Sequence, residues 1–198
     1  RDVAAAVLAT LELPEGQALR ADGLPEPGPR LQDILDTSEP PAVSVRETFD
    51  FWVDPQASGE NEQARQVIEE AIERAKDEIA PTRPVPGVEH AYWCRLGSKE
   101  FVRWVRGEDE DEFFNAFARI YAARESDLEE GARFVGAFRA NGVAIPVWEL
   151  VPGTEAEELT KPLQAMGKRL DAALADESPL TPEVRRAKAG IISRQVNL

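Results

Sequence analysis

The spacing of hydrophobic residues predicts a helix at each end of the first 80 residues and little regular structure between them. Apolar side chains recur every three or four positions over residues 2–11 and again over 60–79, which is typical of helices with one buried side. The intervening segment 14–41 is rich in proline, so we expect a connection with only a short helical turn at 31–35. The alternating stretch 43–53 predicts a strand.

Beyond a second proline-rich linker at 81–86, one pattern occurs twice. Residues 92–106 and 133–151 each predict two strands joined by a tight turn. Each pair of strands is followed by a predicted helix, over 110–123 and over 154–174.

Matching residues in the two patterns suggest an internal duplication. Trp104 and Trp148 lie 148 − 104 = 44 positions apart, and Arg95 and Arg139 have the same separation. We therefore predict an α+β fold in which two duplicated ββα units form one antiparallel sheet with helices packed on it. If the duplication extends upstream, residues 51–53 would belong to a degenerate third copy. The alternative to duplication is a chance repetition of two common arrangements.

We expect residues 1–198 to form a single domain with three parts. Residues 1–80 hold the N-terminal helix, the proline-rich connection, the strand and the long helix, and 88–178 hold the two ββα units. The remaining 179–198 form a basic helix, for which Thr181 supplies the N-cap.

Composition restricts the possible partners. The chain has 198 residues, of which 42% are hydrophobic and 30% charged, as is typical of a folded globular protein. Its net charge of −14 opposes binding to nucleic acid and to anionic membranes, and no apolar run reaches the roughly 20 residues of a membrane span. Cys94 is the sole cysteine, which suits a cytoplasmic protein. Because the sequence begins at Arg1, we expect it to be part of a longer polypeptide.

Six short strings are specific in combination: RDVAAA at 1–6, GPRLQD at 28–33, FDFW at 49–52, AYWCR at 91–95, RFVG at 133–136 and AGIISRQ at 189–195. Together they resemble an uncharacterised actinobacterial family that is known only as a domain of unknown function. The resemblance covers most of the chain and implies a lysine-rich tail upstream in full-length members. Some members carry labels that connect them to the preprotein translocase ATPase, but no ATP-binding motif occurs in this chain. The family implies no catalytic residues.

The sequence contains no recognisable catalytic or cofactor motif. There is no GxxxxGK[ST] loop, no GxGxxG, no HExxH and no CxxC. His90 is the only histidine, and in a strand it would lie about 13 Å from Cys94, beyond the reach of a catalytic pair. The acidic run 108–112 fits either a divalent-cation site or, more simply, the start of a helix. We therefore favour a protein without enzymatic activity, cofactor or metal.

Tryptophans and arginines in the predicted strands are candidates for ligand binding. Trp104 and Trp148 either line an aromatic groove or fill the core, as most large aromatic side chains do, and Trp93 would be the cross-strand partner of Trp104. Arg95 and Arg139 are equivalent in the two units, and a pseudo-twofold axis would bring them to one face to clamp a carboxylate or phosphate. The alternative is that each arginine pairs with nearby acids.

The C-terminal helix is a candidate for partner binding. Its basic residues are Arg185, Arg186, Lys188 and Arg194. On an otherwise acidic chain, this helix either docks to a partner or compensates the charge of the protein body. Our leading prediction is a non-enzymatic domain that binds a protein partner or organises an assembly. The alternative is a small anionic-ligand-binding domain, or an enzyme, that uses the two equivalent arginines.

Overall fold

The structure is a computed structural model that describes residues 2–15, 17, 19–20, 23, 26–36, 38, 42–48, 62–76, 79–140 and 142–193. The Cα positions divide the chain into two compact units, residues 1–44 and 45–198. The described part of the first unit carries two helices, and the second unit carries the sheet and the other helices. The single domain expected from the sequence stays a prediction.

The first unit contains both helices that the hydrophobic pattern predicts. These are α1 (Asp2–Leu11) and the short α2 (Leu31–Ile34). The predicted apolar stripe of α1 is not its buried side, because Ala4 is buried whereas Val3, Val7 and Leu11 are exposed. In the described part of this unit, the buried hydrophobic side chain is therefore the small Ala4.

The second unit begins with an irregular segment and the helix α3 (Glu62–Lys76), which confirms the long helix predicted over 60–79. The expected strand over 43–53 does not form in its described part, since residues 43–48 are irregular. The rest of that strand lies outside the described residues, as does the suggested third copy at 51–53.

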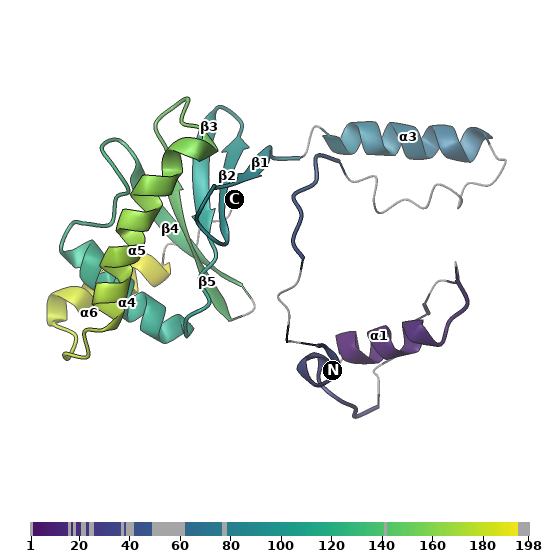
Figure 1. The fold of residues 1–198 in the computed structure, drawn as a ribbon, viewed down its shortest axis with the longest axis horizontal. Coiled ribbons are helices and arrows are strands. Elements are labelled where there is room, and N and C mark those ends of the chain that lie inside the picture. The colour runs from purple at the N-terminus through teal and green to yellow at the C-terminus, as the bar shows by residue number, and fades with distance from the viewer. Residues whose placement is uncertain are drawn as a thin grey trace. The chain divides into compact units, whose positions relative to one another are not determined.

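Five strands form one antiparallel sheet in the order β1-β2-β3-β5-β4 (Figure 1). The sheet confirms the α+β fold class that the sequence predicted. The strands are β1 (Thr82–Pro84), β2 (Ala91–Leu96), β3 (Lys99–Trp104), β4 (Arg133–Ala140) and β5 (Val143–Glu149). The β2–β3 and β4–β5 hairpins are those predicted from the two repeated patterns.

The edge strand β1 was not predicted, because residues 81–86 contain three prolines and were interpreted as a linker. Thr82 lies opposite Cys94, and Pro84 lies opposite Tyr92, so the segment pairs with β2. A proline has no N–H to donate, and an edge strand tolerates it because one side of its backbone needs no partner.

The two hairpins meet where β3 pairs with β5. In this register Phe101 lies opposite Glu149, and Arg103 lies opposite Val147. Arg103 and Val147 are 147 − 103 = 44 positions apart, the same separation as the repeated residues in the sequence. The elements thus occur as β2–β3–α4 and β4–β5–α5 around this central pair, while an origin by duplication stays a prediction.

Helices α4, α5 and α6 gather on one side of the sheet (Figure 1). Their bounds are α4 (Glu110–Ala122), α5 (Thr160–Leu174) and α6 (Pro182–Ser193), and the short 3₁₀ helix η2 (Ala156–Leu159) leads into α5. The predicted helix over 154–174 therefore starts with a tighter turn than expected. Among the described residues, no helix is long and apolar enough to cross a membrane.

The acidic run 108–112 marks the start of α4, as the simpler interpretation predicted. The Asp109 side chain accepts hydrogen bonds from the backbone N–H groups of Asp111 at 2.9 Å and Glu112 at 3.2 Å. These bonds satisfy two donors that every helix start leaves free, and acids in the first turn suit the positive end of the helix dipole.

The main core lies between the sheet and these helices. Its centre is Phe117 of α4, whose ring centroid lies 4.6 Å from that of Phe134 and 6.0 Å from that of Trp148. All three side chains are buried. Leu163 and Met166 from α5 are fully buried in the same cluster, so α4, α5 and the sheet share one core.

We expect Phe117→Ala to lower the free energy of unfolding by about 3–5 kcal/mol, since it removes a large buried ring and leaves a cavity among aromatic neighbours. Urea denaturation followed by tryptophan fluorescence measures this change. Val67→Ala, at an exposed position of α3, is the control and should change the free energy by less than about 0.5 kcal/mol. Equal effects of the two substitutions would contradict the described core.

Candidate binding surface

Arg95, one of the two predicted anion-binding arginines, is engaged within the protein. Its Nε donates to Glu100 Oε1 at 3.1 Å, and its Nη2 lies 3.9 Å from Glu155 Oε1. The guanidinium also stands 5.2 Å from the centroid of the Trp93 ring. Two carboxylates and an aromatic face therefore already surround this cation.

Arg139, the second predicted arginine, is engaged in the same way at another place. It pairs with Glu110 in the first turn of α4, and its guanidinium lies 5.7 Å from the centroid of the Phe114 ring. Each arginine therefore pairs with a nearby acid, which confirms the alternative interpretation of both residues.

The structure does not bring the two arginines together. Arg95 lies opposite Glu100 in β3, whereas Arg139 lies opposite Ala144, whose carbonyl oxygen accepts from Arg106. Positions 100 and 106 are six residues apart along the chain, which corresponds to about 20 Å in an extended strand. Two guanidinium groups this far apart cannot clamp one small anion.

The tryptophans that were candidates for an aromatic groove fill the core instead. Trp93, Trp104 and Trp148 are buried, and their indole N–H groups donate to backbone carbonyl oxygens at 2.7 to 3.1 Å. Trp93 lies opposite Val102, so its predicted cross-strand pairing with Trp104 is wrong. The fourth tryptophan, Trp52, lies outside the described residues.

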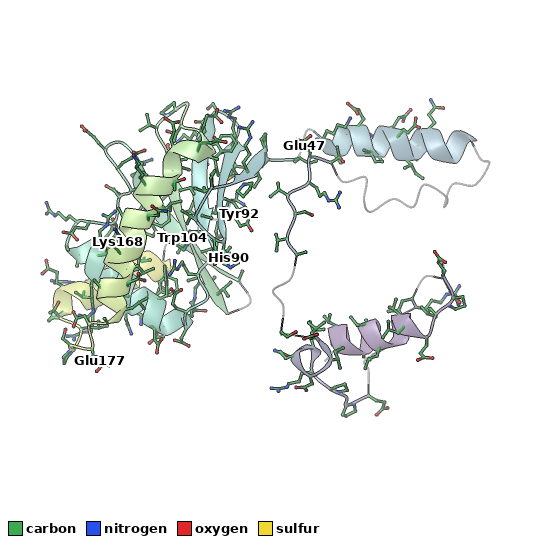
Figure 2. The ribbon with its side chains drawn as sticks, in the orientation of Figure 1. Glu47, His90, Tyr92, Trp104, Lys168 and Glu177 are labelled. Carbon is green, nitrogen blue, oxygen red and sulfur yellow. The ribbon has the colours of Figure 1, made fainter. Side chains whose placement is uncertain are left out.

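Trp104 lines a cavity of about 430 Å³ together with His90, and both are labelled in Figure 2. One face of the indole is taken, because the Arg106 guanidinium lies 4.2 Å from the ring centroid. Arg106 in turn pairs with Glu108. Burial raises the pKa of the Glu108 carboxyl, but the hydrogen bonds of Arg106, a backbone hydrogen bond and the charge of Arg106 together bring it below its usual value. Gly167 lets α5 approach the indole, since a Cβ there would lie 3.4 Å from Trp104. These contacts explain the residues by packing rather than by ligand binding.

The basic residues of α6 are partly used inside the protein. Lys188 Nζ lies 2.6 Å from the Asp111 carboxylate of α4, and Arg185 donates to the backbone carbonyl of Leu180. Arg186 is exposed, and Arg194 lies outside the described residues. Lys188 therefore compensates the acidic start of α4, while partner binding by this helix stays a prediction.

A second hydrophobic cluster lies on the sheet face that α4, α5 and α6 leave uncovered. Its buried members are Cys94, Phe101 and Val147, and the partly buried members that pack against them are Leu96, Val135 and Phe138. Successive side chains of a strand point to opposite faces, and Cys94, Phe101 and Val147 each follow or precede a residue of the main core. Every member of the cluster comes from a strand, and no described helix contributes to it. We call these six residues the helix-free face.

Charged side chains form an ion-pair network at one end of this face. Glu149 Oε1 lies 2.8 Å from Lys99 Nζ, and Glu149 Oε2 lies 3.0 Å from Arg133 Nη2. Hydrogen bonds from Lys99 and then Arg133 lower the pKa of the Glu149 carboxyl below its usual value. One carboxylate thus serves two cations, which leaves this end with an excess of positive charge.

Arg103 lies on the same face, in β3 opposite Val147 of β5. Its Nε is buried without a hydrogen-bond partner, and in the described part of the chain its guanidinium forms no ion pair. The guanidinium lies 5.9 Å from the centroid of the Phe138 ring. Burial raises the pKa of the Cys94 thiol, and the charge of Arg103 partly offsets this increase.

Sequence reasoning did not single out the helix-free face, although a signal was present. A strand with one face in water alternates between apolar and polar residues, whereas β2 reads AYWCRL and is apolar at most positions. Cys94 and Leu96 therefore indicated apolar surroundings on the side away from Trp93. Arg103 stood out less, because an arginine between apolar neighbours in a strand reads as a solvent-facing position.

The fold and its surfaces define an α+β domain whose antiparallel sheet has one face covered by helices and one helix-free face. The chain belongs to a family of unknown function, DUF5926, whose family model matches residues 1–198. This match confirms the resemblance to a domain of unknown function, while the actinobacterial origin and the lysine-rich tail stay predictions. Searches for similar proteins gave no match among curated proteins and none among solved structures.

We expect Glu149→Gln to lower the free energy of unfolding by about 1 kcal/mol at neutral pH, because it weakens two ion pairs. The folded state lowers the pKa of this carboxyl, so its contribution is complete above the ordinary pKa of 4.5 and is lost as the pH falls through the lower folded value. Urea denaturation over a series of pH values should show the wild type and Glu149→Gln converging in acid. The exposed Glu157→Gln is the control, and a difference that does not change with pH would contradict the network.

Lys188→Met should lower the free energy of unfolding by about 1–2 kcal/mol, because it removes hydrogen bonds from a charged donor to Asp111 and Asn115. Arg186→Met, two residues earlier and exposed, should change it by less than about 0.5 kcal/mol. Thermal and urea denaturation both measure the difference. If Arg186→Met had the larger effect, the compensating role of Lys188 would be wrong.

Proposed function

We propose that this chain is a non-enzymatic protein-binding domain that works in the cytoplasm, and that the helix-free face is its binding surface. The observation that carries the proposal is the apolar cluster to which only strands contribute. A sheet face of this kind is normally covered by a second layer, because its apolar side chains gain free energy when they leave water. A partner protein would supply that layer.

The composition of the face fits an interface better than a solvent-exposed sheet. Leu96, Val135 and Phe138 are only partly buried, and full burial of such side chains contributes about 1.5–3 kcal/mol each. Aromatic and arginine side chains dominate the energetics of many interfaces. Phe138 and Arg103 lie together on this face, so we expect them to be the residues on which binding depends most.

Other surfaces support the proposal less well. Arg95 and Arg139 are engaged with acids at separate places, and Lys188 is turned toward α4. The net charge of −14 favours a protein over nucleic acid as the partner. A cytoplasmic setting is proposed from the single, buried Cys94.

Site-specific photo-crosslinking in the native host tests the proposal. A benzophenone amino acid at Phe138 should give a defined adduct with a partner protein, because this side chain lies on the proposed interface. The same amino acid at Gln164, exposed on α5 on the covered side of the sheet, is the matched control and should not give that adduct.

The captured partner is then purified and titrated with the full chain. Phe138→Asp should weaken binding by at least about 30-fold, which corresponds to the loss of about 2 kcal/mol at an interface hot spot. Gln164→Asp should leave binding unchanged. The proposal fails if Phe138 and Gln164 give the same adducts, or if Phe138→Asp binds as well as the wild type while remaining folded by circular dichroism.

A further inference from the structure

We infer that the partner covers the helix-free face with an acidic amphipathic helix, one carboxylate of which pairs with Arg103. The inference rests on the proposed function and specifies the chemistry of the partner.

Arg103 is the observation that calls for a carboxylate. Seven other described arginines have a carboxylate oxygen close to a guanidinium nitrogen; they are Arg30, Arg83, Arg95, Arg106, Arg119, Arg133 and Arg139. Arg103 has an aromatic neighbour and no such carboxylate in the described part of the chain. In a protein with 37 acidic and 23 basic residues, this leaves a cation available on the surface we propose for binding.

The charge of the whole face points in the same direction. Among the described strand residues, Lys99, Arg103 and Arg133 share it with one carboxylate, Glu149, although the chain as a whole is strongly acidic. A local excess of positive charge attracts an acidic segment and discourages a basic one. It also opposes the stacking of two copies through this face, since the same cations would then meet.

The size of the face fits a helix of four to five turns. Leu96 in β2 and Phe138 in β4 mark its diagonal, which crosses three strand spacings and about six residues along the strands. With about 4.8 Å between strands and about 3.3 Å per residue, the diagonal measures about 24 Å, or about 16 residues of α-helix. Arg103 and Val147 lie near the middle of this line, so a carboxylate halfway along the helix would reach the guanidinium.

The other face of this sheet is already covered by helices, because α4 and α5 each pack one apolar side against the strands. A helix is therefore a suitable element for the helix-free face as well. A second helical layer would present an apolar stripe, repeated every three or four residues along its whole length, to Leu96, Val135 and Phe138. The carboxylate would accept hydrogen bonds from Arg103, whose pairing with a carboxylate can involve two parallel bonds. Apolar contact gives the affinity, and the ion pair selects acidic partners.

Selection from a displayed library of 18-residue helical peptides tests the inference on the full chain. Enriched peptides should carry branched aliphatic or aromatic residues every three or four positions along their length, together with a central Asp or Glu. For one enriched peptide, replacing that acid by its amide should weaken binding to the wild type at least about tenfold, as expected for a lost charged hydrogen bond. Against Arg103→Gln, the acid and the amide should bind equally.

Two controls separate this inference from the proposed function. Phe138→Asp should abolish binding of the enriched peptides, whereas Gln164→Asp should not, with folding of each variant checked by urea denaturation. Peptides that need Phe138 but show no preference for acids would overturn the acidic-helix inference and leave the binding surface intact. Peptides indifferent to Phe138 would overturn both. A dimer of this chain that Phe138→Asp abolishes would identify a second copy as the occupant and also overturn the inference.

Discussion

The antiparallel pairing of β3 with β5 is the constraint on which the rest of the structure depends. It joins two hairpins that otherwise have separate turns, and it sets which side chains share a face. Because the two strands run antiparallel, one hairpin turn lies at each end of the sheet. The equivalent arginines Arg95 and Arg139, which stand beside those turns, are therefore held far apart. The same pairing places Arg103 at the centre of the opposite face.

Tertiary packing then follows from the large aromatic residues on one face. Phe117 contacts rings from both β4 and β5, so a single helix residue links α4 to the second hairpin. Helices α5 and α6 extend this layer, and the buried indole N–H groups of Trp93 and Trp148 donate to backbone carbonyl oxygens. The outcome is a layered domain with a strongly packed side and a second, smaller apolar cluster on the other.

Local patterns were sufficient to predict most of the regular elements. The hairpins and the helices α4 and α6 were expected from alternation, from turn residues, from the acidic run 108–112 and from the N-cap Thr181. The strand β1 was not, because three prolines in 81–86 are a stronger local signal for a linker than for a strand. Whether such a segment pairs depends on a free edge of β2, which is a property of the assembled sheet.

The candidate surface was harder to predict than the fold. The equivalent positions of Arg95 and Arg139 in the two sequence repeats did not predict the distance between their side chains, because that distance depends on the way the two hairpins join. Their neighbours Glu100 and Glu110 could not be assigned as partners before the register and the helix position were known. Arg103 became notable only through what surrounds it, namely Phe138 and the absence of an acid within the described residues.

The edges of the sheet bear on how this protein can associate. One edge strand, β1, is three residues long and ends in Pro84, while the other, β4, is interrupted by a bulge between Phe134 and Gly136 and carries charged residues near both ends. Short length, proline, bulges and charge all hinder the addition of another strand. Growth of the sheet sideways into fibrous aggregates is thereby disfavoured, because neither edge offers a long, regular ladder of free backbone groups to another strand.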